Sequence, residues 1–205
     1  GELPGAYDVA VADFDGDGQL EIVASSWTKA RDFSYYDRQA GDWVKTVIDS
    51  GLGETRAVIA ADINGDGRPD LLGTDTGHGH LIWYENPGDP SNTPWPRHLI
   101  DKTSRPNQCN VVDMDGDGSV DVVIGNCGEA AQVLLNRAGA EKNWLMVRLV
   151  GKSSNRDGVG ARLNLHVGGR VLHRQKKGGG SYLSAHDGRV HFGLGSSPRA
   201  DRLEV

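Results

Sequence analysis

Three short acidic loops hold the residues of this chain whose types and spacing could do chemistry. They read DFDGDGQLE, DINGDGRPD and DMDGDGSVD and cover residues 13–21, 62–70 and 113–121. Oxygen-bearing side chains stand at positions 1, 3, 5 and 9 of each loop. These residues are Asp13, Asp15, Asp17 and Glu21; Asp62, Asn64, Asp66 and Asp70; and Asp113, Asp115, Asp117 and Asp121. Alternate oxygens in a tight turn can point into one cavity, and hard ligands in that number suit Ca²⁺ better than the strictly octahedral Mg²⁺.

The charge of the loops also favours a bound cation. The loops contain eleven carboxylates, and like charges held a few ångström apart destabilise one another when they are partly desolvated. Up to three Ca²⁺ ions would add six positive charges and bring the net charge of the chain from −6 to about zero. We therefore expect metal binding to be coupled to folding of the loops.

An EF-hand and a metal-free turn are the two alternatives to a calcium loop of this kind. An EF-hand shares the first half of the pattern, but it needs a Glu at position 12 and a helix on each side. Position 12 here is Ala24, Gly73 or Ile124, which excludes an EF-hand. An Asp-Gly turn without metal would account for one loop more simply, whereas three copies in register favour calcium.

The loops mark an internal repeat. They begin 49 and 51 residues apart, and short β-branched runs such as YDVAVAD and LEIVASS flank them, which predicts a strand, the loop and a second strand. Each repeat supplies about four strands, the content of one β-propeller blade, although the third repeat keeps only QVLLNRAG of its second half. We predict an all-β fold with three propeller-type blades, either an incomplete propeller or a fragment of one.

Charge divides the chain into two predicted modules. Residues 1–141 hold 24 acidic and 10 basic residues, a net of −14, whereas residues 142–205 hold 4 and 12, a net of +8. Alternating segments such as ARLNLHV predict that the second module is a small β-sandwich or barrel. Its last residues, ADRLEV, look like the start of a strand, so we expect this module to be truncated.

Both modules resemble known families. The repeats resemble the FG-GAP and VCBS repeats of extracellular β-propellers, whose blade loops bind calcium through a D-x-[DN]-x-D-G-x-x-D pattern. Glu21 departs from the final Asp by one methylene, so a weaker or differently closed first site is expected. NWLMVRLVG, SNRDGVGARLNLHVGG, GGGSYLS and HFGLG resemble the ASPIC/UnbV domain, which follows such repeats in secreted proteins. The resemblance implies secretion and a surface or matrix role rather than a reaction.

The two cysteines could form a disulfide. Cys109 precedes the third loop and Cys127 follows it, so a hairpin folded about Asp117 would bring them nearly opposite each other. A cross-strand disulfide would match an extracellular compartment. Two buried free thiols are the alternative.

Other candidate residues carry weaker signals. His78 and His80 could face one side of a strand, but a zinc site needs a third ligand that the sequence does not identify. Trp27, Trp83 and Tyr84 could form a sugar-stacking surface. Two repeat-equivalent tryptophans, Trp43 and Trp95, are expected to pack within the blades. We found no catalytic motif and no run of about 18 apolar residues, and the acidic balance disfavours nucleic acid.

The leading hypothesis is a secreted, calcium-stabilised adhesion or recognition scaffold that binds glycan or protein and is not an enzyme. Three blades leave strand edges unpaired, so an alternative is a self-assembling subunit of an extracellular filament or matrix. A third possibility is the accessory part of a polysaccharide-degrading enzyme.

Overall fold

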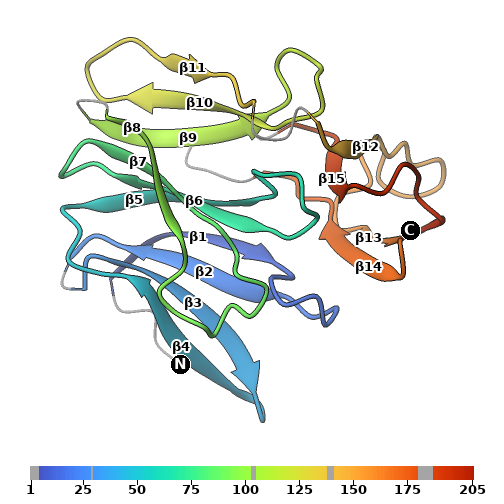
Figure 1. The fold of residues 1–205 in the computed structure, drawn as a ribbon, viewed down its shortest axis with the longest axis horizontal. Coiled ribbons are helices and arrows are strands. Elements are labelled where there is room, and N and C mark those ends of the chain that lie inside the picture. Colours follow the sequence, from blue (N-terminus) through green and yellow to red (C-terminus); the bar gives the residue numbers. More distant parts are fainter. Residues whose placement is uncertain (1–4, 29, 103–104, 138–140, 180–186) are drawn as a thin grey trace.

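The chain folds into β-sheets, connected by turns and loops (Figure 1). The computed structural model describes residues 5–28, 30–102, 105–137, 141–179 and 187–205. Within these ranges there are sixteen strands and no helix. The predicted all-β class is confirmed.

Three sheets follow one another along the chain and stack in the manner of propeller blades, with no closed barrel (Figure 1). The first sheet contains β1 (Ala6–Ala12), β2 (Glu21–Ser26), β3 (Asp32–Gln39) and β4 (Asp42–Asp49); the second contains β5 (Thr55–Ala61), β6 (Asp70–Asp75), β7 (His80–Tyr84) and β8 (Arg97–Lys102); the third contains β9 (Pro106–Val112), β10 (Asp121–Asn126) and β11 (Gln132–Leu134). Each sheet is an antiparallel meander. The third has three strands, as its shortened repeat predicts.

The inner strands of a sheet are more buried than its outer strand. All six residues of β6 are buried, because this strand lies between neighbours in its own sheet and between the two adjoining sheets. The outer strand β8 is mostly exposed. The first strands lie side by side, with β1 against β5 and β5 against β9. The blades are therefore joined along their first strands, and their outer strands reach toward solvent.

Aromatic side chains fill the space between the first and second sheets. The Phe33 and Tyr84 rings meet edge to face with centroids 5.6 Å apart, and Phe14 lies 6.0 Å from Trp95. Gly73 lets the Phe33 ring approach the β6 backbone, since a Cβ there would overlap the ring. A second apolar cluster fills the space between the second and third sheets. Burial of these side chains is the main apolar contribution to blade stacking.

The predicted aromatic roles are only partly found. Trp95 is 2% exposed and packs between blades, but its repeat equivalent Trp43 is 38% exposed on the outer strand β4. Tyr84 is 1% exposed, Trp83 stacks on His98, and Trp27 is exposed. Trp27, Trp83 and Tyr84 therefore do not form one sugar-stacking surface.

The C-terminal residues form two small sheets around their own apolar cluster. The first pairs β12 (Asn143–Val147) with β15 (Val190–Gly195), and the second contains β13 (Arg162–Val167), β14 (Arg170–Gln175) and β16 (Arg202–Glu204). Phe192, Leu163 and Leu165 are fully buried at the centre of the cluster. The division of the chain into residues 1–141 and 142–205 stays a prediction.

The predicted disulfide is corrected by the register of the third hairpin. Cys109 lies opposite Ile124, and the Cys127 N–H donates to the carbonyl of Arg105 at 3.1 Å. Arg105 stands four residues before Cys109, so the two cysteines are separated by about 13 Å of strand, well beyond the Cα separation that a disulfide spans. Both cysteines are free, Cys109 buried and Cys127 exposed.

This difference in burial predicts different thiol reactivity. Burial raises the pKa of the Cys109 thiol to about 12, so it holds almost no thiolate at about pH 8. We expect a thiol-specific chromophoric reagent to modify only Cys127 in the native chain and both cysteines after denaturation. No reactive thiol under either condition, with a mass lower by two hydrogens, would indicate the disulfide instead.

Candidate metal centres

The three acidic loops connect the first two strands of each sheet and share one hydrogen-bonding plan. The position 1 carboxylate accepts two backbone N–H groups from later in its own loop. Asp13 accepts from Gly16 at 2.7 Å and Gly18 at 3.1 Å, Asp62 from Asp66 at 3.0 Å and Gly67 at 2.8 Å, and Asp113 from Gly116 at 2.7 Å and Gly118 at 3.2 Å. The glycines are needed because Gly16 and Gly18 have φ of 81° and 88°, a region that other residues rarely adopt.

Positions 3 and 5 continue the same plan. Each side chain accepts the N–H two residues further along, which is an Asx-turn. The acceptors and their donors are Asp15 and Asp17, Asn64 and Asp66, Asp115 and Asp117 for position 3, and Asp17 and Gln19, Asp66 and Arg68, Asp117 and Ser119 for position 5. The distances run from 2.7 to 3.3 Å. Successive turns thus fold the side-chain oxygens of each loop into a compact group.

Position 9 is buried at the start of the second strand of each hairpin. Glu21 is 2% exposed, and Asp70 and Asp121 are fully buried. Each accepts the N–H of position 2, with distances of 2.8 Å from Phe14, 3.0 Å from Ile63 and 2.8 Å from Met114. Burial raises the pKa of Glu21 to about 8 and that of Asp70 to about 8. A nearby cation would favour the charged form of both groups.

The structure brings the predicted ligands together to different degrees. Asp13, Asp15, Asp17 and Glu21 each offer an oxygen, and these atoms lie within 4.8 Å of one another. Asp113, Asp115 and Asp117 do the same, with Asp121 outside the group. The first loop therefore gathers all four of its predicted ligands, although a weaker site was expected there because of Glu21. Both clusters fit a cation that accepts several oxygens in flexible geometry.

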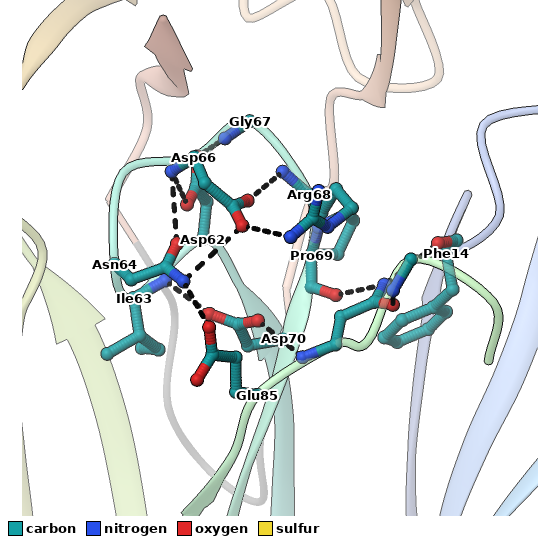
Figure 2. Close-up of polar contacts among 12 residues, drawn as sticks. Phe14, Asp62, Ile63, Asn64, Asp66, Gly67, Arg68, Pro69, Asp70 and Glu85 are labelled. Carbon is teal, nitrogen blue, oxygen red and sulfur yellow. Dashed lines mark hydrogen bonds and ion pairs between the residues drawn. The ribbon is translucent and has the colours of Figure 1, made fainter. Parts of the chain in front are cut away.

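Arginine side chains lie against the second and third loops. Arg137 Nη1 is 2.9 Å from both Asp115 Oδ2 and Asp117 Oδ2, so one guanidinium bridges two predicted ligands. In the second loop Arg68 pairs with Asp66, whose carboxylate lies between Arg68 and Asn64 (Figure 2). These arginines partly offset the charge of their loops.

Two asparagines link the first acidic loop to the second blade and the second acidic loop to the third blade. Asn86 Nδ2 donates to the carbonyl of Phe14 in the first loop at 2.8 Å and to Pro69 in the second at 3.0 Å. Asn136 Nδ2 likewise donates to the carbonyl of Ile63 in the second loop at 2.8 Å and to that of Val120 in the third at 3.1 Å. The backbone N–H of each asparagine donates to the position 9 carboxylate of its own blade. The asparagines therefore fix neighbouring loops relative to each other.

The C-terminal sheets contact all three loops. His173 Nε2 lies 4.0 Å from Asp13 Oδ2, and His191 Nε2 lies 2.8 Å from the carbonyl of Gly118. Arg170 and Arg174 donate to the carbonyls of Asp66 and Gly67, each at 3.1 Å, and Gly195 N–H donates to Gly65 at 3.0 Å. The basic C-terminal module therefore docks on the acidic loops mainly through backbone carbonyls.

The sequence reasoning missed the two asparagines, and for the basic residues of the C-terminal module it left docking on the acidic repeats and a solvated face as alternatives. A signal for the asparagines was present, because WYENPG and LLNRAG each place an Asn two residues after the third strand of a repeat. For Arg174 and His191 the only signal was the basic excess of residues 142–205. That excess could not distinguish a docking surface from a solvated one.

Comparison with known proteins matches both parts of the chain. The FG-GAP-like repeat family matches residues 62–124, and the ASPIC and UnbV family matches residues 151–205. The second and third repeats are thus similar to FG-GAP-like repeats, and the C-terminal sheets to an ASPIC/UnbV domain. The first loop lies outside the matched residues but has the same hydrogen-bonding plan as the FG-GAP loops at 62 and 113.

Curated relatives cover both modules in one alignment. Cartilage acidic protein 1 of Mus musculus is 28% identical over 225 residues, and that of Xenopus tropicalis is 28% identical over 222, each alignment covering 96% of this chain and 33% of the relative. The protein of the same name from Homo sapiens is also 28% identical, with 96% and 32% covered. The chain thus spans about a third of the length of these relatives.

Removing one asparagine linker should weaken the FG-GAP blades. Asn86→Ala leaves the buried carbonyls of Phe14 and Pro69 without this donor, and we expect the free energy of unfolding to fall by about 2 to 3 kcal/mol. Urea unfolding measures it. Asn92→Ala, in the exposed connection after β7, is the matched control and should change the value by less than about 0.5 kcal/mol. Equal effects of the two substitutions would contradict the linker role.

The bridging arginine should compete with a cation in the third FG-GAP loop. Arg137→Gln removes a positive charge that holds two predicted ligands, so we expect calcium to bind that loop about two- to fivefold more tightly, the effect of an exposed ion pair. Competition with a chromophoric chelator measures the affinity. Lys102→Gln, opposite His80 at the other end of the second sheet, changes the net charge equally and should leave it unchanged. Weaker calcium binding in Arg137→Gln would refute the competition.

Proposed function

We propose that this chain is part of a secreted, calcium-stabilised adhesion or recognition scaffold that binds glycan or protein and does no catalysis. The observation that carries the proposal is the hydrogen-bonding plan repeated in three loops, which gathers oxygens at Asp13, Asp15, Asp17 and Glu21 and again around Asp113. Such repetition suits an architectural ion better than one catalytic centre.

The comparisons support an extracellular matrix or adhesion type of protein. The relatives are named cartilage acidic protein 1, and the FG-GAP-like repeat and ASPIC/UnbV descriptions name no reaction. In the described part of the chain, no helix is both long and apolar enough to cross a membrane. We infer a secreted protein whose partners are proteins or glycans of the cell surface or matrix.

Calcium would act on the assembly of the two modules. The loops turn their side-chain oxygens inward and offer backbone carbonyls to Arg170, Arg174 and His191. An ion that fixed the loop would therefore fix the carbonyls on which the C-terminal sheets dock. In this proposal calcium holds the blades and the C-terminal module in one recognition surface.

One exposed aromatic group offers a contact for a partner. Tyr7 and Trp27 are 39% and 43% exposed, with ring centroids 5.8 Å apart. The Arg56 guanidinium carbon lies 5.6 and 5.7 Å from the two ring centroids. Aromatic faces beside a cation suit stacking on a sugar ring or on a side chain of a protein partner.

The proposal is tested by thermal unfolding in EGTA and in millimolar Ca²⁺. Each site that binds only the folded chain adds about 2.7 kcal/mol at a hundredfold excess over Kd. For a chain of this size we expect the melting temperature to rise by roughly 2 to 4 °C per kcal/mol. Magnesium at the same concentration is the control and should have a much smaller effect. An unchanged melting temperature in calcium would refute calcium stabilisation.

Size-exclusion chromatography under the same conditions separates the scaffold from the filament alternative. Exposed apolar side chains such as Met114, Val133 and Leu135 lie on the third sheet or in its loops and could pair with a second copy. A monodisperse monomer in calcium supports the scaffold. Open-ended oligomers would favour the filament subunit.

A further inference from the structure

A turn at the far end of the second sheet gathers two imidazoles and a carboxylate. Asp75 is the last residue of β6, His78 lies in the turn, and His80 is the first residue of β7. One potential ligand atom from each residue lies within 4.8 Å of the other two. This end of β6 is opposite the end that begins at Asp70 in the acidic loop. Asp75 is therefore the candidate for the third ligand that the sequence did not identify.

Asp75 is held in place by the backbone. Its Oδ1 accepts the N–H groups of Gly53 and Glu54, each at 3.0 Å, while its Oδ2 lies 2.7 Å from Nδ1 of His78. Asp75 is fully buried. Burial alone would raise the pKa of this carboxyl, but the N–H groups and His78 lower it. Asp75 is thus an oriented carboxylate, and its Oδ2 faces an imidazole that is half exposed.

His80 carries a polar atom that needs a partner. Its Nδ1 is buried and has no hydrogen-bond partner among the described residues, an arrangement that normally costs free energy. Desolvation lowers the pKa of His80, with Arg97 and Lys102 adding to this effect and Asp75 opposing it. His80 lies beside His78 and Asp75, and an unpartnered imidazole nitrogen of this kind can bind a metal through its lone pair.

We propose that Asp75, His78 and His80 bind a divalent transition metal of the zinc type. Zn²⁺ takes imidazole nitrogens at about 2.0 Å and carboxylate oxygens at similar length, so its tetrahedral ligands stand about 3.3 Å apart. Ligand atoms up to 4.8 Å apart would have to close by about 1.5 Å at most, whereas Asp75 Oδ2 and His78 Nδ1, now 2.7 Å apart, would have to separate slightly. The half-exposed ring of His78 can move to allow this. Calcium is disfavoured because it prefers oxygen ligands. Solvent would take the remaining coordination position on the exposed side of His78.

The site would be independent of the acidic loops and would stabilise a different connection. Asp75 already ties the turn to Gly53 and Glu54, which precede β5. A metal on the same carboxylate would lock the β6–β7 turn to the connection between the first and second sheets. Failure of the calcium proposal would leave this site unaffected.

Isothermal titration with ZnCl₂ in saturating Ca²⁺ tests the proposal, since calcium then occupies the carboxylate loops. We expect one Zn²⁺ per chain, with affinity falling more than about tenfold in His78→Gln and in His80→Gln, because losing even an outer hydrogen-bond partner of a ligand has that effect. His166→Gln, on β13, is the matched control and should bind as the unchanged chain does. Circular dichroism in the same Ca²⁺ buffer, without zinc, checks that the variants fold.

A second measurement identifies the ligands directly. Imidazole nitrogen NMR should show that Zn²⁺ shifts the resonances of His78 and His80 and leaves those of His98 and His166 unchanged. Unchanged zinc affinity in both glutamine variants, or zinc that only displaces calcium, would overturn the proposal.

Discussion

The structure depends on how eleven carboxylates are held together at the turns of three stacked hairpins. Backbone N–H groups supply the first part of the answer, since every position 1 side chain accepts two of them and positions 3, 5 and 9 each accept at least one. These bonds orient the oxygens but add no positive charge. The protein is therefore arranged around acceptors that still need cations, which the loops obtain from arginines and, in our proposal, from calcium.

This constraint also accounts for how the blades and the C-terminal sheets are joined. Asn86 and Asn136 donate hydrogen bonds to carbonyls of neighbouring loops, so the geometry of one loop sets the position of the next blade. Arg174 and His191 form hydrogen bonds with other carbonyls of the loops. These bonds place a positively charged module against a negatively charged one. Because the docking uses mainly main-chain oxygens, it leaves most side-chain oxygens of the loops available to face a metal.

The sequence was sufficient to predict the strands, the blades and the turns of the acidic loops, because these follow from local rules. Alternating apolar residues define strands, and glycines at fixed loop positions define turns. Features that depend on hairpin register or on distant parts of the chain were not predictable. Cys109 and Cys127 lie on one hairpin, yet a register different from a simple fold about Asp117 separates them. Asp75 lies only three residues before His78, but its role depends on a turn held by Gly53 and Glu54.

The central claim is that each acidic loop is built to hold one calcium ion, and the most direct test is the number of ions bound per chain. Native mass spectrometry or equilibrium dialysis gives this number. The account predicts three for the unchanged chain and one fewer in Asp15→Ala, which removes a ligand from the first loop only. A chain that binds no calcium, or whose bound number is unaffected by Asp15→Ala, would contradict it.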